Sequence, residues 1–181
     1  MKVFIDPGHG GQHPGAVNVS SGRKEKDATL QIGLKLRDRL NRMGFVTLMS
    51  RECDEHVELS ERCRMANKWC ADCFVSIHLN APGQTSGAET WYYVSAKAKT
   101  RELARLVQRA LIASTGARDR GVKTTESFTT CKRTYMPSIV VECGFITNDK
   151  ESEKCFSPSY QDAIVNGIAN GLLQWKQWHE G

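Results

Sequence analysis

Hydrophobic residues gather in short runs that are rich in β-branched and aromatic side chains. The runs are Val3 to Ile5, Phe45 to Met49, Phe74 to Ile77, Trp91 to Val94 and Ile139 to Val141. Short and nearly continuous runs of this kind are typical of strands that are buried on both faces. They predict a sheet in the interior of the molecule.

Longer segments between and after these runs carry hydrophobic residues at helical spacing. The clearest extends from Asp27 to Met43, where Asp27 is the expected N-cap and Gly44 is expected to end the helix. The others are Glu58 to Trp69, Thr100 to Thr115 and Tyr160 to Trp178. Because strands alternate with helices, the pattern predicts right-handed βαβ units. The expected fold class is α/β, with a single twisted, mostly parallel sheet flanked by helices on both faces.

Length and composition favour an ordinary globular protein. A chain of 181 residues fits one compact unit, so we expect residues 1–181 to form a single domain. Apolar residues make up 40% and charged residues 25% of the chain, which argues against disorder. No apolar run approaches the ~20 residues that span a bilayer, and no secretory leader precedes the first strand. We therefore expect synthesis in the cytoplasm without a signal peptide, and no stable membrane insertion.

The net charge bears on the expected partners, and the cysteine count bears on the expected state of the thiols. The formal net charge of +5 is modest, and the basic residues are spread without the aromatic-plus-basic module of RNA-binding proteins. Nucleic acid is therefore not an expected partner. The cysteine count of seven is odd, so reduced thiols are expected rather than a disulfide framework. Cys70 and Cys73 form a C-x-x-C pair, but a structural zinc would need a second ligand pair, so we expect buried thiols of undefined role.

Polar side chains stand at the carboxyl ends of three predicted strands. His9 follows the first strand, His78 ends the third, and Glu142 ends the strand that begins at Ile139. Because ligands of open α/β sheets bind at this edge, the three side chains are expected to lie close together. An ionised carboxylate at the position of Glu142 is costly unless it is paired, linked to a metal or catalytic.

A third metal ligand is available in the loop expected before the first helix, where Glu25 lies at the same edge of the sheet. Two imidazoles, one carboxylate and an open position fit catalytic zinc. Asp6 or a backbone carbonyl is expected to orient one imidazole. Each residue also has an ordinary interpretation, as a turn residue, a core histidine, a solvated charge or half of an ion pair. If these ordinary interpretations held, all four residues would have to lie at one edge of the sheet by chance.

Longer motifs extend this pattern along nearly the whole chain. They are D-P-G-H-G-G from Asp6 to Gly11, E-K-D from Glu25 to Asp27, V-x-L-x-x-R from Val57 to Arg62, Ala66 with Asn67, A-D-C-F-V-S-I-H-L-N-A from Ala71 to Ala81, G-A-E from Gly87 to Glu89, and the segment from Pro137 to Asn148. In this order and spacing the chain resembles the zinc-dependent N-acetylmuramoyl-L-alanine amidases of the type 3 amidase family. The resemblance implies one zinc ion bound by His9, Glu25 and His78, a catalytic glutamate at Glu142, and a supporting role for Asn80.

The resemblance also implies the substrate and the setting. Family members hydrolyse the amide between the lactyl group of N-acetylmuramic acid and L-alanine in peptidoglycan, which is therefore the expected partner. The interval from Val94 to Met136 looks too short for the autoinhibitory helix of some members, so an open site is expected. We expect a monomer that acts on the cell wall as a phage or prophage endolysin. The alternative is the catalytic domain of a secreted autolysin or a sporulation amidase.

Two other classes compete with this interpretation. A thiol hydrolase would use Cys143 with His78, but neighbours along a strand face opposite sides, so Cys143 should point away from Glu142. A wall-binding module without turnover would be expected to lack a metal ligand or Glu142, and all of these residues are present.

Overall fold

The computed structural model describes residues 1–81 and 83–180. Within these residues one six-stranded sheet has the strand order β2-β1-β3-β6-β4-β5. The strands are β1 Lys2–Pro7, β2 Val46–Met49, β3 Cys73–Asn80, β4 Ala88–Tyr93, β5 Asp119–Thr125 and β6 Ser138–Phe145. All neighbouring strands are parallel except β4 and β6, which are antiparallel. The expected α/β class with a single, mostly parallel sheet is therefore confirmed.

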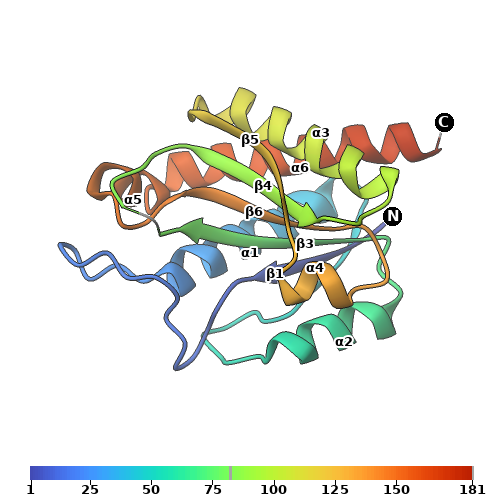
Figure 1. Ribbon diagram of the computed structural model, residues 1–181, viewed down its shortest axis with the longest axis horizontal. Coiled ribbons are helices and arrows are strands. Elements are labelled where there is room, and N and C mark those ends of the chain that lie inside the picture. The colour runs from blue at the N-terminus through green and yellow to red at the C-terminus, as the bar shows by residue number, and fades with distance from the viewer. Residues whose placement is uncertain (82, 181) are drawn as a thin grey trace.

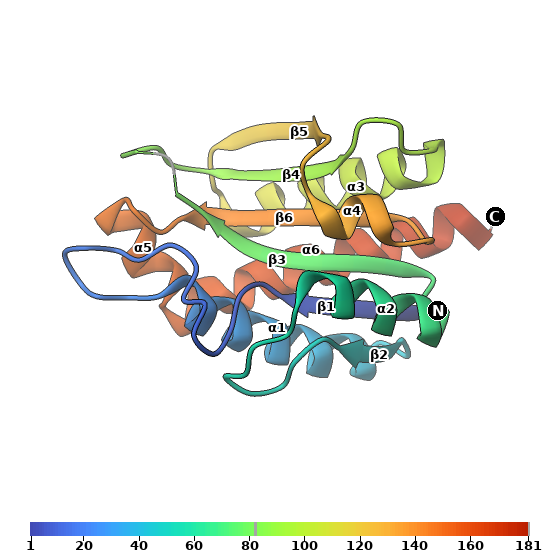
Figure 2. The ribbon, with the colours of Figure 1, turned by 60° about the horizontal axis from the view of Figure 1, so that its bottom comes forward.

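Helices cover both faces of the sheet, as expected. Figure 2 shows α2 and α4 in front of the sheet and α1, α3 and α6 behind it. The helices are α1 Glu25–Arg42, α2 Leu59–Trp69, α3 Ala98–Thr115, α4 Thr129–Arg133, α5 Asp149–Cys155 and α6 Pro158–Glu180. The short α5 follows β6 at the end of the molecule where β3 and β6 terminate (Figure 1).

The two faces of the sheet differ in what they bury. The main hydrophobic core lies on the side of the three long helices and includes Val3, Ile5, Ile32, Leu36, Val75, Ile77, Leu103, Val141, Ile164 and Ile168. On the other face the buried apolar cluster is small and centres on the stacked rings of Phe4 and Phe74. Further along the same face the strands carry Asp6, Ser76 and Glu142, because side chains alternate along a strand. This leaves a polar surface at the carboxyl ends of β1, β3 and β6.

Several local expectations were wrong. The first helix begins at Glu25 rather than after Asp27, and the residue before it, Lys24, makes no side-chain capping bond. Not every strand is buried on both faces, since Val46 of the edge strand β2 is exposed. The other edge strand, β5, is absent from the strands expected from the sequence. Its partly exposed positions leave no hydrophobic run for sequence analysis to detect.

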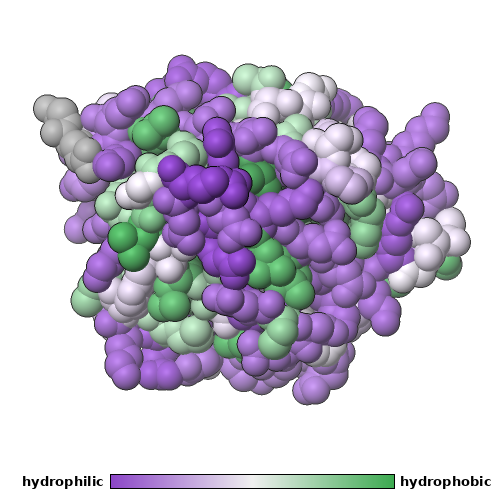
Figure 3. All heavy atoms as spheres, turned by 180° about the vertical axis from the view of Figure 1, so that it is seen from behind, coloured by the Kyte–Doolittle hydropathy of each residue, from purple (hydrophilic) through white to green (hydrophobic). Residues whose placement is uncertain are grey.

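Surface and thiol properties agree only in part with expectation. In the part of the chain that the structure describes, no helix has the length and apolar character to cross a membrane. Figure 3 shows a mainly hydrophilic surface on the side opposite to Figure 1, with hydrophobic residues in small, separate patches.

All seven cysteines are free thiols. Cys73 is buried, but Cys70 is exposed because it is the left-handed residue that ends α2.

Candidate metal site

The loop after β1 presents His9 in an unusual backbone conformation. The φ angle of His9 is 62°, in the left-handed region that few residues other than glycine adopt. Two buried arginines hold this loop through its carbonyl groups. Nη2 of Arg62 donates to the His9 carbonyl at 2.7 Å, and Nη2 of Arg51 donates to the Gly8 carbonyl at 2.9 Å. The position of His9 is therefore fixed by contacts with residues far along the chain.

Arg62 also forms a buried ion pair with Asp6. Its Nη1 lies 2.7 Å from Oδ1 of Asp6, and the hydroxyl groups of Ser50 and Ser76 each donate to this carboxylate at 2.7 Å. Burial alone would raise the pKa of Asp6, but the charge of Arg62 and these hydrogen bonds lower it. The expectation that Asp6 orients an imidazole was wrong, because both of its oxygens accept from other groups. Asp6 instead anchors the arginine that holds the loop.

Replacing Arg62 by Met is expected to lower the free energy of unfolding by about 3–5 kcal/mol, because the Asp6 carboxylate stays buried without its cation. Arg64 on the same helix pairs with Glu61 at the surface and provides the matched control. Arg64→Met should change stability far less, because water and salt screen an exposed ion pair. Urea unfolding of both variants measures the difference. Equal effects would contradict the anchoring role of the buried pair.

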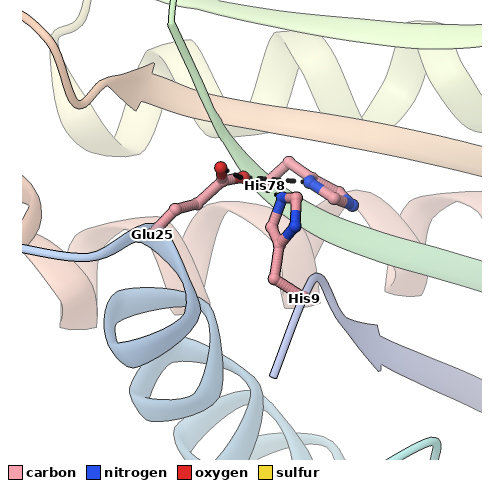
Figure 4. A group of neighbouring side chains, drawn as sticks. All are labelled: His9, Glu25 and His78. Carbon is pink, nitrogen blue, oxygen red and sulfur yellow. Dashed lines mark hydrogen bonds and ion pairs between the residues drawn. The ribbon is translucent and has the colours of Figure 1, made fainter. Parts of the chain in front are cut away.

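Three candidate ligands meet at the carboxyl edge of the sheet (Figure 4). His9 follows β1, Glu25 is the first residue of α1, and His78 lies in β3. Nε2 of His9 lies 3.0 Å from one carboxylate oxygen of Glu25, and Nδ1 of His78 lies 2.9 Å from the other. One ligand atom from each residue lies within 4.8 Å of the other two. The structure therefore brings the three residues together, although Glu25 lies in a helix and not in the expected loop.

The Glu25 carboxylate and the His78 imidazole shift each other's pKa. Glu25 is buried and also accepts hydrogen bonds from the backbone N–H groups of Ala16 and Leu79. Burial would raise the pKa of Glu25, but the hydrogen bonds from His78 and His9 hold it well below its usual range. Burial would lower the pKa of His78, but the Glu25 carboxylate raises it to about 9. The raised pKa means that the His78 imidazole attracts a proton. A divalent cation bound by the same side chains would replace that proton.

The three donor atoms suit a zinc ion, and the protein backbone packs closely against the side chains that carry them. Two imidazole nitrogens and one carboxylate oxygen are ligands that zinc accepts in catalytic sites, where a fourth position stays open. A Cβ atom on Gly15 would lie 2.6 Å from both Oε2 of Glu25 and Cδ2 of His9. A Cβ atom on Gly8 would lie 2.3 Å from Cε1 of His78. The two glycines are thus required by the close approach of the backbone to the three side chains.

Glu142 stands beside this group without a hydrogen-bond partner of its own. It lies on β6 directly opposite His78 of β3, and its side chain faces the same side of the sheet. The residue is only 8% exposed, and Oε2 has no hydrogen-bond partner among the described residues. Burial raises the pKa of Glu142 to about 7, although His78 acts in the opposite direction. A carboxyl group that titrates near neutrality with a free oxygen is suited to act as a general base.

The neighbouring strand β4 carries a second buried glutamate, Glu89, in the opposite situation. Its carboxylate accepts from Asn80 Nδ2 at 2.7 Å, Trp91 Nε1 at 3.0 Å, Arg120 Nε at 2.7 Å and Lys123 Nζ at 2.6 Å. Burial would raise the pKa of Glu89, but these donors lower it. In the sequence Glu89 stands out only as part of the G-A-E motif, and no local pattern predicts these contacts. Asn80 supports this carboxylate, consistent with the supporting role implied for it.

A cleft of about 400 Å³ opens onto the candidate site between the N-terminal ends of α2 and α4. His9, His78 and Glu142 line it together with residues such as His56 and Phe128. The side chains of His9 and His78 are 31% and 24% exposed, so both imidazoles are partly accessible from the cleft. This agrees with the open site that was expected.

Cys143 points away from the cleft, as strand alternation predicted. Its side chain is fully buried in the main core, in the same cluster as Cys155. Burial raises the pKa of the Cys143 thiol well above its usual value. A buried, protonated thiol on the opposite face from His78 cannot act as the nucleophile of this site. The thiol hydrolase interpretation is therefore contradicted.

Residues 3–174 match the N-acetylmuramoyl-L-alanine amidase family known as Amidase_3. A sporulation-specific N-acetylmuramoyl-L-alanine amidase of Bacillus subtilis (strain 168) is 39% identical over 176 residues, which cover 96% of this chain and 68% of that protein. An endolysin of Bacillus phage SPP1 is 34% identical over 178 residues, which cover 95% and 65% of the two chains. The crystal structure of an N-acetylmuramoyl-L-alanine amidase from Clostridium difficile 630 superposes with a TM-score of 0.95 at 40% identity, covering 97% of this chain and 96% of that one. The chain belongs to the N-acetylmuramoyl-L-alanine amidase family.

Proposed function

We propose that this protein is a zinc-dependent hydrolase of the amide between the lactyl group of N-acetylmuramic acid and L-alanine in peptidoglycan. The observation that carries the proposal is the grouping of His9, Glu25 and His78 within 4.8 Å, beside an unpartnered carboxyl group. Family membership supports the choice of substrate. The chemistry of the site supports hydrolysis rather than binding alone, because a wall-binding module has no need of a free, buried base.

His9, Glu25 and His78 would hold one zinc ion, which when bound lowers the pKa of water to about 7 and polarises the scissile carbonyl. Arg51 and Arg62 keep His9 in place through the loop carbonyls. Preorganisation of this kind matters because ligands held in position need no rearrangement during the reaction.

Glu142 acts as the proton carrier of the reaction. Its free Oε2 accepts a proton from the attacking water, and the same oxygen then donates that proton to the departing alanine nitrogen. Both transfers use one carboxyl group, which explains why a pKa near 7 suits it. The hydrogen-bonded Glu89 on the next strand stays ionised and takes no part in this exchange.

We further propose that residues 1–181 form one catalytic unit that acts as a monomer on the cell wall, with peptidoglycan and not nucleic acid as its partner. The phage endolysin among the relatives supports a role in cell lysis. The sporulation-specific amidase, which is somewhat more similar, supports the alternative role in a bacterial wall. Both roles use the same reaction.

Digestion of purified peptidoglycan tests the proposed activity. We expect new N-terminal alanine groups to appear, their release to stop after treatment with a chelator, and zinc to restore it. Dinitrophenyl labelling and the masses of the released peptides identify the bond that is cut. Release of reducing sugars instead of alanine N-termini, or activity that survives complete removal of metal, would refute the proposal.

A further inference from the structure

Two cations lie on the edge strand β5, two strands away from the strand that carries the proposed base. Arg120 and Lys123 of β5 both donate to the same oxygen of Glu89, at 2.7 Å and 2.6 Å. Glu89 is 1% exposed, whereas the two cationic side chains are 23% and 33% exposed. The two cations therefore share one carboxylate oxygen, and both remain partly exposed to solvent.

Each of the two cations lies against an aromatic ring. The Arg120 guanidinium lies 5.0 Å from the centre of the Phe145 ring, and the Lys123 ammonium lies 5.2 Å from the centre of the Trp91 ring. Such cation–π contacts are favourable and restrict the motion of long side chains. Within residues 1–81 and 83–180, neither terminal nitrogen of the Arg120 guanidinium makes a hydrogen bond, and Lys123 uses its ammonium only once. The group therefore presents free donors from ordered side chains.

The distance between the proposed base and these donors determines which residue of a bound peptide the donors can contact. β4 separates β5 from β6, and strands lie ~4.8 Å apart, so β5 lies roughly 10 Å from the strand of Glu142. An extended peptide advances about 3.3–3.6 Å per residue. A peptide that begins at the scissile amide and crosses β4 would thus bring its second or third residue to Arg120 and Lys123.

We propose that Arg120 and Lys123 form a subsite that binds a carboxylate on the second or third residue of the stem peptide. This inference rests on the proposed amidase function. The chemistry required is that of an anionic peptide group, because guanidinium and ammonium donors bind carboxylates strongly. If the two cations only compensated the charge of Glu89, their role would be purely structural. Substrates with and without a carboxylate would then be cleaved equally well.

The test compares two muramoyl tripeptides that start with L-alanine and end in a C-terminal amide. One carries a free carboxylate on both its second and its third residue, and the other carries carboxamides at both positions. The zinc-loaded protein should cleave the carboxylate form with a kcat/KM about tenfold higher, mainly through a lower KM, as for a charge-assisted contact at a partly exposed site. Arg120→Gln and Lys123→Gln should each reduce this preference, and the double variant should abolish it.

Two further variants separate recognition from folding and from general charge. Arg120→Lys keeps the charge and should keep most of the preference. Lys132→Gln removes an exposed cation on α4 and should leave the preference unchanged. Equal cleavage of the two substrates by the unaltered protein would overturn the inference, as would an undiminished preference in a folded double variant. Cleavage of whole peptidoglycan together with equal cleavage of the two tripeptides refutes the subsite but leaves the amidase activity standing. Failure on all three substrates refutes the proposed function itself.

Discussion

The Glu142→Gln protein is expected to bind zinc normally and to lose about 10²–10⁴-fold in kcat, the usual contribution of a positioned general base. Gln has nearly the same shape, so the three candidate ligands keep their places. It has no oxygen that can take up and return a proton. The measurement pairs the rate of alanine release with zinc content by mass spectrometry. A variant with full activity would contradict the assignment of Glu142.

The same variant has a second expected effect, which appears in the metal-free protein. Because burial raises the pKa of Glu142 from 4.5 to about 7, the folded state binds a proton more tightly than the unfolded state. The sign follows from linkage: stability falls as the pH rises from about 4.5 to about 7, and the loss persists at higher pH. Relative to the unaltered chain, Glu142→Gln should therefore gain more stability at pH ~8 than at pH ~5, by up to about 3 kcal/mol.

Unfolding in urea at both pH values, with a chelator present, measures this gain. The cost of burying an amide in place of a carboxyl group is the same at the two pH values, so it cancels in the comparison. An identical effect at both values would show that Glu142 is not held in its protonated form by burial.

The second large effect is expected at the metal. His78→Ala should lower zinc affinity by more than the ~10–100-fold that loss of an outer-shell contact costs, because it removes a ligand outright. Activity should fall with the metal. His78 forms part of the group whose atoms lie within 4.8 Å of one another, and its pairing with Glu25 is seen in Figure 4. His9→Ala should behave alike.

His13 provides the matched control for this experiment. It lines the same cleft, but it is not part of the group of three. His13→Ala should keep stoichiometric zinc in a dialysed sample, whereas His78→Ala should not. Competition with a coloured chelator gives both affinities. Equal zinc affinity in the two variants would place the metal elsewhere in the cleft.

The candidate site was largely predictable because topology alone brings strand ends together. His78 and Glu142 lie near the carboxyl ends of β3 and β6, and the parallel pairing of these two strands places them side by side. The contacts that hold His9 were not predictable in the same way. Arg51 and Arg62 act on backbone carbonyls about 40–50 residues away, and local spacing shows no trace of such contacts. Of the two, only Arg62 lies in one of the recognised motifs, V-x-L-x-x-R from Val57 to Arg62.

The fold was predictable where hydrophobic periodicity was strong and was missed where it was weak. Buried strands such as β3 and β6 produce unbroken apolar runs, and their positions were found. β5 is an edge strand with half-exposed positions, and its sequence Asp119–Thr125 contains one large aliphatic residue, Val122. α4 and α5 are too short for a helical period to appear. The cation pair of the proposed subsite lies on β5, so it was missed together with its strand.

The central claim is that one zinc ion is bound by His9, Glu25 and His78 beside a free Glu142. Anomalous diffraction from crystals of the zinc-loaded protein, recorded on both sides of the zinc absorption edge, tests it most directly. We expect a single strong peak at bonding distance from these three side chains, with the Glu142 carboxylate outside the coordination sphere. A peak at other residues, or one with Glu142 as a direct ligand, would contradict it.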